Sequence, residues 1–138
     1  MPAAAAALFP VYFRRMADVL RIRDLRVYLD VDAGTVKAVD GVSFRIPEGR
    51  TVALVGESGS GKTMVAQAIM SILPRVARIE GGEILFLDPR KPGTVVDISR
   101  LDAEGAQVRE IRGGRISIIF QEPMTALSPL HTVGNQIG

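Results

Sequence analysis

Residues 51–70 decide the fold, and they read Thr51-Val52-Ala53-Leu54-Val55-Gly56-Glu57-Ser58-Gly59-Ser60-Gly61-Lys62-Thr63-Met64-Val65-Ala66-Gln67-Ala68-Ile69-Met70. The apolar run 51–55 predicts a buried β-strand, and the pattern after residue 63 predicts an α-helix. Between them, residues 56–63 fit the pattern Gly, four residues, Gly-Lys-Ser/Thr, which is the phosphate-binding P-loop. A strand, this loop and a helix in that order predict an α/β fold of the P-loop NTPase type.

The residue types in the loop suit a nucleoside triphosphate. Consecutive backbone N–H groups in a tight loop form a concave anion site, and the following helix adds its positive end. We expect Lys62 to reach the β- and γ-phosphates, and the hydroxyl of Thr63 to hold Mg²⁺. The predicted nucleotide-binding residues are Gly56, Glu57, Ser58, Gly59, Ser60, Gly61, Lys62, Thr63 and Met64. The alternative, a Gly/Ser turn that happens to precede a lysine, is disfavoured by the flanking strand and helix.

Composition excludes several classes of protein. The chain has 138 residues, of which 47% are hydrophobic and 23% charged, as in an ordinary globular α/β domain. A net charge of +2 is too small to indicate binding to nucleic acid. The absence of cysteine excludes disulfides and thiolate metal sites. No apolar run reaches the roughly 18 residues needed to span a bilayer, so we expect any membrane role to act through a partner.

The N-terminal segment differs in composition from the rest. Residues 1–10 are apolar and of low complexity, and the positive charge of Arg14 and Arg15 follows the apolar run, which is the reverse of a signal peptide. We therefore predict that residues 1–17 are a disordered extension, or that translation starts at Met16 rather than Met1. Residues 18–138 form the predicted domain.

Periodicity predicts the remaining elements. Strands are expected at 19–29, with an irregularity at 23–24, and at 36–46, 83–87 and 115–120. Helices are expected at 62–73 (ended by Pro74), at 103–111 and from about 132. Residues 81–82, a glycine pair, should break the chain, and residues 88–99 should form a hairpin or loop.

A second motif starts at the end of the strand predicted for 115–120. It reads Ile118-Ile119-Phe120-Gln121-Glu122-Pro123-Met124-Thr125-Ala126-Leu127-Ser128-Pro129. Together with the P-loop, it resembles the ATPase subunits of ABC transporters, and most closely the dipeptide/oligopeptide (or nickel) importers. Residues 38–44 and 132–137 also look like that group, so the resemblance covers 18–138. It implies an ABC-type nucleotide-binding domain with an N-terminal antiparallel β subdomain beside a partial core sheet.

The resemblance implies roles for further residues. In the family, the glutamine at the position of Gln121 touches Mg²⁺ and the attacking water, so Thr63 and Gln121 are the candidate metal ligands. Glu122 falls at a coupling-loop position rather than that of a base. An aromatic residue of the first strand stacks on adenine in this family. Here either a bulge turns Tyr28 inward to do so, or adenine packs on Leu29.

The resemblance also implies partners and a location. These are transmembrane permease subunits, a second ATP-binding subunit in a head-to-tail dimer and, indirectly, an extracytoplasmic solute-binding protein, at the cytoplasmic face of the membrane. No nucleic acid is expected.

Three motifs of the family have no counterpart in the 138 residues: its signature motif, its catalytic glutamate and its switch histidine. His131, the single histidine, is expected to be a loop residue. We therefore expect the N-terminal portion of an ATP hydrolase, inactive by itself. Two alternatives remain open, a different P-loop ATPase such as a kinase, and a non-catalytic docking module.

Overall fold

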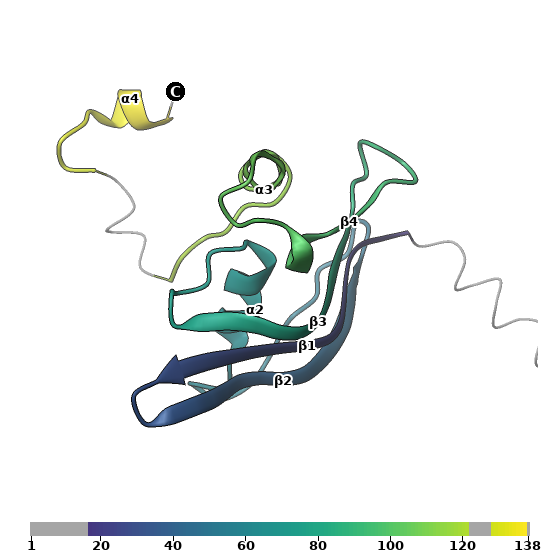
Figure 1. The fold of residues 1–138 in the computed structure, drawn as a ribbon. Coiled ribbons are helices and arrows are strands. Elements are labelled where there is room, and N and C mark those ends of the chain that lie inside the picture. The colour runs from purple at the N-terminus through teal and green to yellow at the C-terminus, as the bar shows by residue number, and fades with distance from the viewer. Residues whose placement is uncertain (1–16, 122–127, 138) are drawn as a thin grey trace, which may run out of the picture.

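The computed structural model describes residues 17–121 and 128–137, and its centre is a four-stranded antiparallel sheet in the spatial order β2-β1-β3-β4 (Figure 1). The strands are β1 (Asp18–Val31), β2 (Gly34–Pro47), β3 (Ala77–Leu87) and β4 (Val95–Asp97). The helical elements are α2 (Lys62–Ile69), the 3-10 helix η1 (Ile98–Arg100), α3 (Ala106–Ile111) and α4 (Val133–Ile137). The predicted N-terminal antiparallel β subdomain is confirmed.

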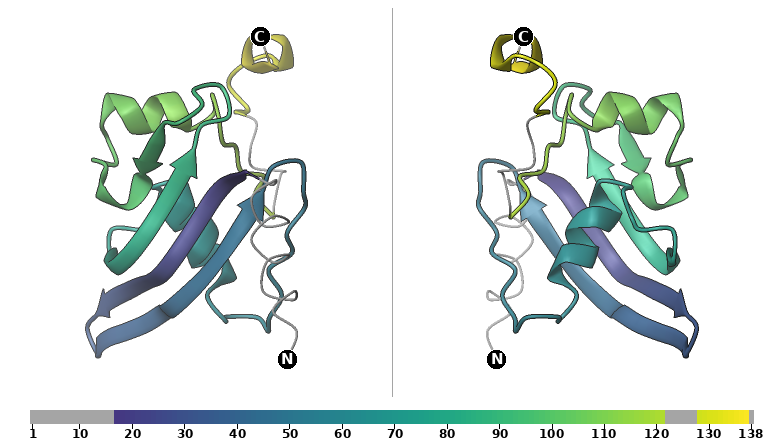
Figure 2. Two further views of the ribbon diagram at one scale, coloured as in Figure 1. Left: turned by 90° about the vertical axis from the view of Figure 1, so that its right-hand side faces the viewer. Right: turned by 90° about the vertical axis from the view of Figure 1, so that its left-hand side faces the viewer.

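The core lies between the sheet and the helix that follows the P-loop. Helix α2 lies across one face of β1 and β2, as the two views of Figure 2 show. Because side chains alternate along a strand, one face of each strand can be apolar. The buried cluster combines Leu20, Ile22, Leu25 and Val27 of β1, Ile84 and Phe86 of β3, and Val65 and Ala68 of α2.

The predicted irregularity at residues 23–24 is confirmed as a β-bulge in β1. The pairing of β1 with β2 shifts between Ile22 and Leu25, so both residues remain buried although they are three apart. Asp24 has a positive φ of 45°, and its N–H donates to Ser43 Oγ at 2.8 Å. The bulge changes which face the later residues of β1 occupy.

The predicted break at residues 81–82 is wrong, because β3 runs through both glycines from Ala77 to Leu87. Gly82 has a φ of 90°, and the carbonyl oxygens of Arg23 and Asp24 fill the space that a Cβ atom on Gly82 would need. The glycine therefore allows β3 to pass close to the bulge of β1 rather than ending the strand.

Helix α2 ends at Ile69, four residues before the predicted end at Leu73. Ser71 has a left-handed φ of 53°. Its N–H donates to Ala68 O at 3.1 Å, and Ile72 N–H donates to Gln67 O at 2.9 Å. These are the two hydrogen bonds of a Schellman motif, so local capping ends the helix before Pro74 is reached.

The strands predicted at 51–55 and 115–120 are not formed. Val55 is 86% exposed and Ile119 is 94% exposed. A strand exists only with a hydrogen-bonded neighbour, and among the described residues this region has just one bridge, between Arg112 and Ile116. The described part of the chain therefore has no parallel core sheet beside the antiparallel one.

Other predicted elements agree with the structure. Of residues 88–99, predicted as a hairpin or loop, 88–97 form the turn and second strand of the β3–β4 hairpin and 98–99 begin η1. The helix predicted at 103–111 is the shorter α3, and the helix predicted from about 132 is α4. The prediction for residues 1–17 lies outside the described residues except for Ala17, whose carbonyl accepts the Glu48 N–H at 2.8 Å. No helix in the described ranges is both long and apolar enough to cross a bilayer.

Candidate nucleotide-binding site

The P-loop forms a tight turn that leads directly into α2. Ser60 N–H donates to Glu57 O at 3.2 Å, and Gly61 caps the helix with a left-handed φ of 89°. The helical bonds begin with Val65 N–H, which donates to Gly61 O at 3.1 Å. The N–H groups of the first turn, on Lys62, Thr63 and Met64, precede that bond and lack an acceptor within the helix. The loop and helix predicted from the sequence are thus present, with an open helix N-terminus.

The ammonium of Lys62 folds back over the loop. It donates to Gly56 O at 2.8 Å, to Glu57 O at 2.5 Å and to Ser60 Oγ at 3.2 Å. No acidic side chain lies in the first turn of α2 to occupy the helix N-terminus. A positive charge and unpaired N–H groups therefore meet at one exposed point, which suits an anion such as a phosphate.

Gly61 fits tightly against β2. The carbonyl oxygen of Ala38 fills the space that a Cβ atom on Gly61 would need, and Val39 Cγ2 would lie 3.4 Å from that atom. Ala38 is the extra residue of a β-bulge, since Val27 pairs with Val39 while Tyr28 pairs with Lys37. Sequence reasoning missed this contact, because neither the bulge nor its approach to the loop leaves a periodic signal.

No hydrogen bond or ion pair within the described part of the chain brings the two candidate metal ligands together. Thr63 and Gln121 are both exposed, and within 17–121 and 128–137 no hydrogen bond joins Gln121 to the loop. Those same residues contain no group of three or more His, Cys, Asp or Glu able to hold a metal ion. Glu122 lies outside the described residues.

Tyr28 does not face the P-loop side of the sheet. The bulge that would turn it inward is absent from this part of β1, because the extra residue lies in β2 at Ala38. Val27 is buried in the core beneath α2, so the next side chain, Tyr28, points to the opposite face. Leu29 shares the face of Val27. Of the two alternatives for the adenine contact, this register favours Leu29 over Tyr28.

The hydroxyl of Tyr28 donates to Asp40 Oδ1 at 3.0 Å, and the Lys37 ammonium lies 5.4 Å from the centre of the ring. The hydrogen bond from Tyr28, followed by the Lys37 ammonium, lowers the pKa of the Asp40 carboxyl despite some desolvation. The hydrogen bond to Asp40 and its charge raise the pKa of Lys37. Tyr28 is therefore engaged in a polar cluster on the outer face of the hairpin.

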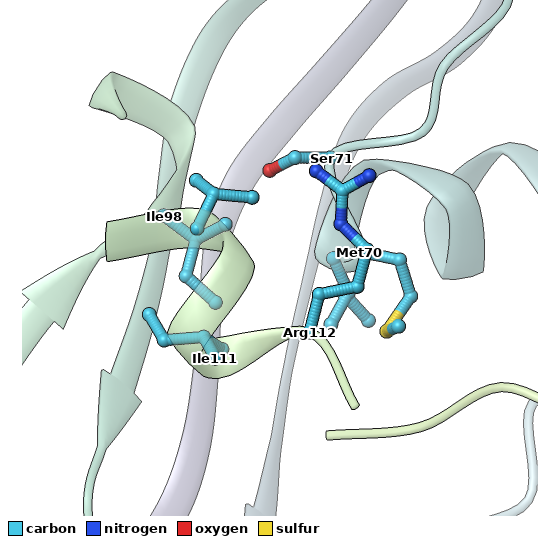
Figure 3. A pocket seen from close by; sticks show the side chains of 7 residues that line it. Met70, Ser71, Ile98, Ile111 and Arg112 are labelled. Carbon is cyan, nitrogen blue, oxygen red and sulfur yellow. The ribbon is translucent and has the colours of Figure 1, made fainter. Parts of the chain in front are cut away.

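A small cavity among the described residues lies away from the P-loop. It has a volume of about 10 Å³ and lies where α2, η1 and α3 meet, with Met70, Ser71, Ile98, Ile111 and Arg112 around it (Figure 3). That volume is close to that of a single water, far too small for a nucleotide. The P-loop itself is an exposed loop, so a nucleotide would bind on an open surface.

Comparison with known proteins agrees with this geometry. The sequence model of the family described as "ABC transporter" matches residues 39–136, a range that holds the P-loop, α2 and most of α4.

This chain belongs to the ABC transporter family.

The curated relatives come from its ATP-binding subunits. The dipeptide transport ATP-binding protein DppD of Bacillus subtilis is 46% identical over 124 residues, which cover 89% of this chain and 34% of DppD. The glutathione import ATP-binding protein GsiA of Salmonella typhimurium is 42% identical over 121 residues, which cover 87% of this chain and 19% of GsiA. The chain thus spans about a third of DppD and less of GsiA. It is an ABC-type ATP-binding domain with the P-loop NTPase fold.

Proposed function

We propose that this ABC ATP-binding domain binds MgATP through residues 56–63 and contributes the P-loop half of an ATP site that powers import of peptides or a related small solute. The observation that carries the proposal is the position of the Lys62 ammonium over the loop at the open N-terminus of α2. Both relatives described above are import or transport ATP-binding proteins for peptides, DppD for dipeptides and GsiA for glutathione, itself a short peptide.

Different groups of the loop would bind different parts of the triphosphate and its metal. When a nucleotide binds, the Lys62 ammonium would leave its acceptors in the loop and donate to phosphate oxygens instead. Phosphate oxygens are negatively charged, whereas the loop acceptors are neutral. The N–H groups of Lys62, Thr63 and Met64 would bind phosphate oxygens at the helix N-terminus. Hydroxyl and amide oxygens are ligands that Mg²⁺ accepts, so Thr63 and Gln121 are the residues proposed to hold it. The metal supplies positive charge between the β- and γ-phosphates.

The base is proposed to contact Leu29 rather than Tyr28. Leu29 is half-buried and lies on the same face of β1 as Val27, whereas Tyr28 lies on the other face. A leucine offers apolar contact without aromatic stacking, so discrimination between adenine and other bases should be weak.

We also propose the partners that are typical of the family. They are transmembrane permease subunits, a second ATP-binding subunit and, indirectly, a solute-binding protein, with this chain at the cytoplasmic face of the membrane. The segment 122–127, which carries the predicted coupling-loop residues, lies outside the described residues.

Titration of the 138-residue chain with MgATP in a calorimeter tests the nucleotide site. Lys62→Ala should weaken binding at least about tenfold, because charge-assisted hydrogen bonds to phosphate are lost. Lys91→Ala is the matched control, since it removes one positive charge from an exposed pair with Glu110, at 3.4 Å, and leaves the loop untouched. Equal affinity in wild type and Lys62→Ala would contradict the proposal.

Uptake of a labelled dipeptide by cells tests the transport role. Disruption of the gene should lower uptake, and wild type should restore it while Lys62→Ala should not. Restoration by Lys62→Ala would favour a docking module that needs no nucleotide.

A further inference from the structure

Three polar side chains form a cluster on the face of the β1–β2 hairpin that points away from α2. The Tyr28 cluster, as we call it, consists of Tyr28, Lys37 and Asp40. The Tyr28 hydroxyl donates to Asp40 Oδ1 at 3.0 Å, and Lys37 Nζ donates to Asp40 Oδ2 at 3.4 Å. Lys37 Nζ also lies 5.4 Å from the centre of the Tyr28 ring, within the range of a cation–π contact. The cluster therefore joins β1 to two separate positions of β2.

The cluster exists only in the bulged register of β2. Lys37 and Asp40 are three residues apart, and strict alternation would place them on opposite faces of the strand. The extra residue at Ala38 brings both to the outer face, beside Tyr28. Removing the bulge would turn Lys37 or Asp40 away from its partner, so the contacts of the cluster stabilise the bulged register over a slipped one.

The other side of the same bulge touches the P-loop. The carbonyl oxygen of Ala38 packs against Gly61, the residue that caps α2. Gly61 is followed by Lys62, whose ammonium lies over the loop. A shift of the Ala38 carbonyl would therefore move the start of the helix that presents the phosphate-binding groups.

We propose that the Tyr28 cluster positions the P-loop through the bulge at Ala38, so that nucleotide affinity depends on a hydroxyl facing away from the nucleotide. The inference rests on the proposed function of residues 56–63 as the phosphate site. Tyr28, Lys37 and Asp40 are positioning residues in this scheme, because none of them touches the nucleotide.

MgATP titration of the 138-residue chain tests the proposal with Tyr28→Phe, which removes the hydroxyl and keeps the ring. Affinity should fall about fivefold, the effect of one lost hydrogen bond that fixes the register. The urea midpoint should stay near that of wild type, because an exposed pair contributes little to global stability. Thr35→Val is the matched control: it removes the bond of Thr35 Oγ1 to Asp30 Oδ1 (3.0 Å) on the same hairpin, away from the bulge, and should change neither value.

A conservative replacement separates positioning from a general structural role. Asp40→Ala should weaken MgATP binding as Tyr28→Phe does. Asp40→Asn keeps an acceptor oxygen for the tyrosine and should restore affinity to within about twofold of wild type. Equal affinity in Tyr28→Phe and wild type would overturn the inference. So would equal losses in Tyr28→Phe and Thr35→Val, or a loss that only follows the urea midpoint.

Amide NMR shifts test the same coupling without nucleotide. Tyr28→Phe should move the Gly61 and Lys62 amide signals more than Thr35→Val does, and equal shifts would contradict the inference. A wild-type chain that binds no MgATP but shows this pattern of shifts would count against the proposed function and support the coupling. The two proposals can therefore fail separately.

Discussion

The carbonyl oxygen of Ala38 faces Gly61 so closely that no side-chain atom fits between them. This contact joins the bulge of β2 to the residue that caps the P-loop helix, where the φ of 89° is also one that side chains disfavour. Glycine is thus required at position 61 for two reasons: the positive φ of its backbone, and the lack of space for a Cβ atom beside the Ala38 carbonyl oxygen.

Gly61→Ala should therefore remove nucleotide binding and destabilise the chain, by more than the roughly 1 kcal/mol that a left-handed φ costs an alanine. Gly59→Ala isolates the conformational part, because Gly59 has a φ of 80° and open space around its Cβ position. Urea unfolding and MgATP titration measure the two effects. Similar losses of stability in both variants would show that the Ala38 carbonyl moves aside at little cost.

Two isoleucines of predicted strands, Ile84 and Ile119, should differ in how much each contributes to the free energy of unfolding, because only one of them is buried. Ile84 has no exposed surface, and Ile119 is 94% exposed. Ile84→Ala should lower the free energy of unfolding by about 2–5 kcal/mol, since it leaves a cavity in the core. Ile119→Ala should change it by less than about 0.5 kcal/mol. Urea unfolding of both variants checks this, and a large loss in Ile119→Ala would mean that residues 115–120 are packed in solution.

Acid should weaken the fold partly through Asp88. Burial of the Asp88 carboxyl acts to raise its pKa, but the Arg90 N–H and the Arg115 guanidinium outweigh burial and hold the pKa below its ordinary value. Arg115 Nε lies 3.1 Å from Asp88 Oδ2. Because the folded-state pKa is the lower one, the stabilisation is present above the unfolded-state pKa and is lost as pH falls through the folded-state pKa, from about pH 4 downward.

Asp88→Asn should therefore flatten the acid side of a plot of unfolding free energy against pH. The matched control is Asp32→Asn, a change to an exposed carboxylate in the turn between β1 and β2. Chemical unfolding at a series of pH values gives the comparison. An acid slope in Asp88→Asn as steep as that of wild type would exclude this carboxylate as a source of the pH dependence.

The end of α2 offers a stabilising substitution. Ser71 holds a φ of 53° in the Schellman motif, a position that glycine adopts without strain. Ser71→Gly should raise the free energy of unfolding by up to about 1 kcal/mol, less the extra freedom of glycine in the unfolded chain. Ser117→Gly, at a residue without positive φ, should be neutral or destabilising. A Ser71→Gly variant that is less stable than wild type would show that the serine side chain supports the cap.

Local pattern in the sequence determined much of this protein. The Gly-Lys-Thr motif predicted the loop and the helix at Lys62, because glycine conformation and helix initiation depend on neighbouring residues. Alternation predicted β1 and β2, and the offset at Arg23 and Asp24 predicted the bulge of β1. The motifs also predicted the family, because a motif is defined by residue types at fixed spacing in the sequence.

Tertiary structure alone decided the rest. Whether residues 51–55 form a strand depends on a hydrogen-bonded neighbour, which an apolar run cannot supply for itself. The sequence predicts a chain break at Gly82, and only its contact with the bulge of β1 shows why the strand continues through it. The sequence leaves Tyr28 and Leu29 open as the adenine contact, and only the register of β1 with β2 decides which of them shares the face of Val27. In each case the deciding interaction joins segments that are distant in sequence. Local propensity depends only on neighbouring residues, so it cannot predict such a contact.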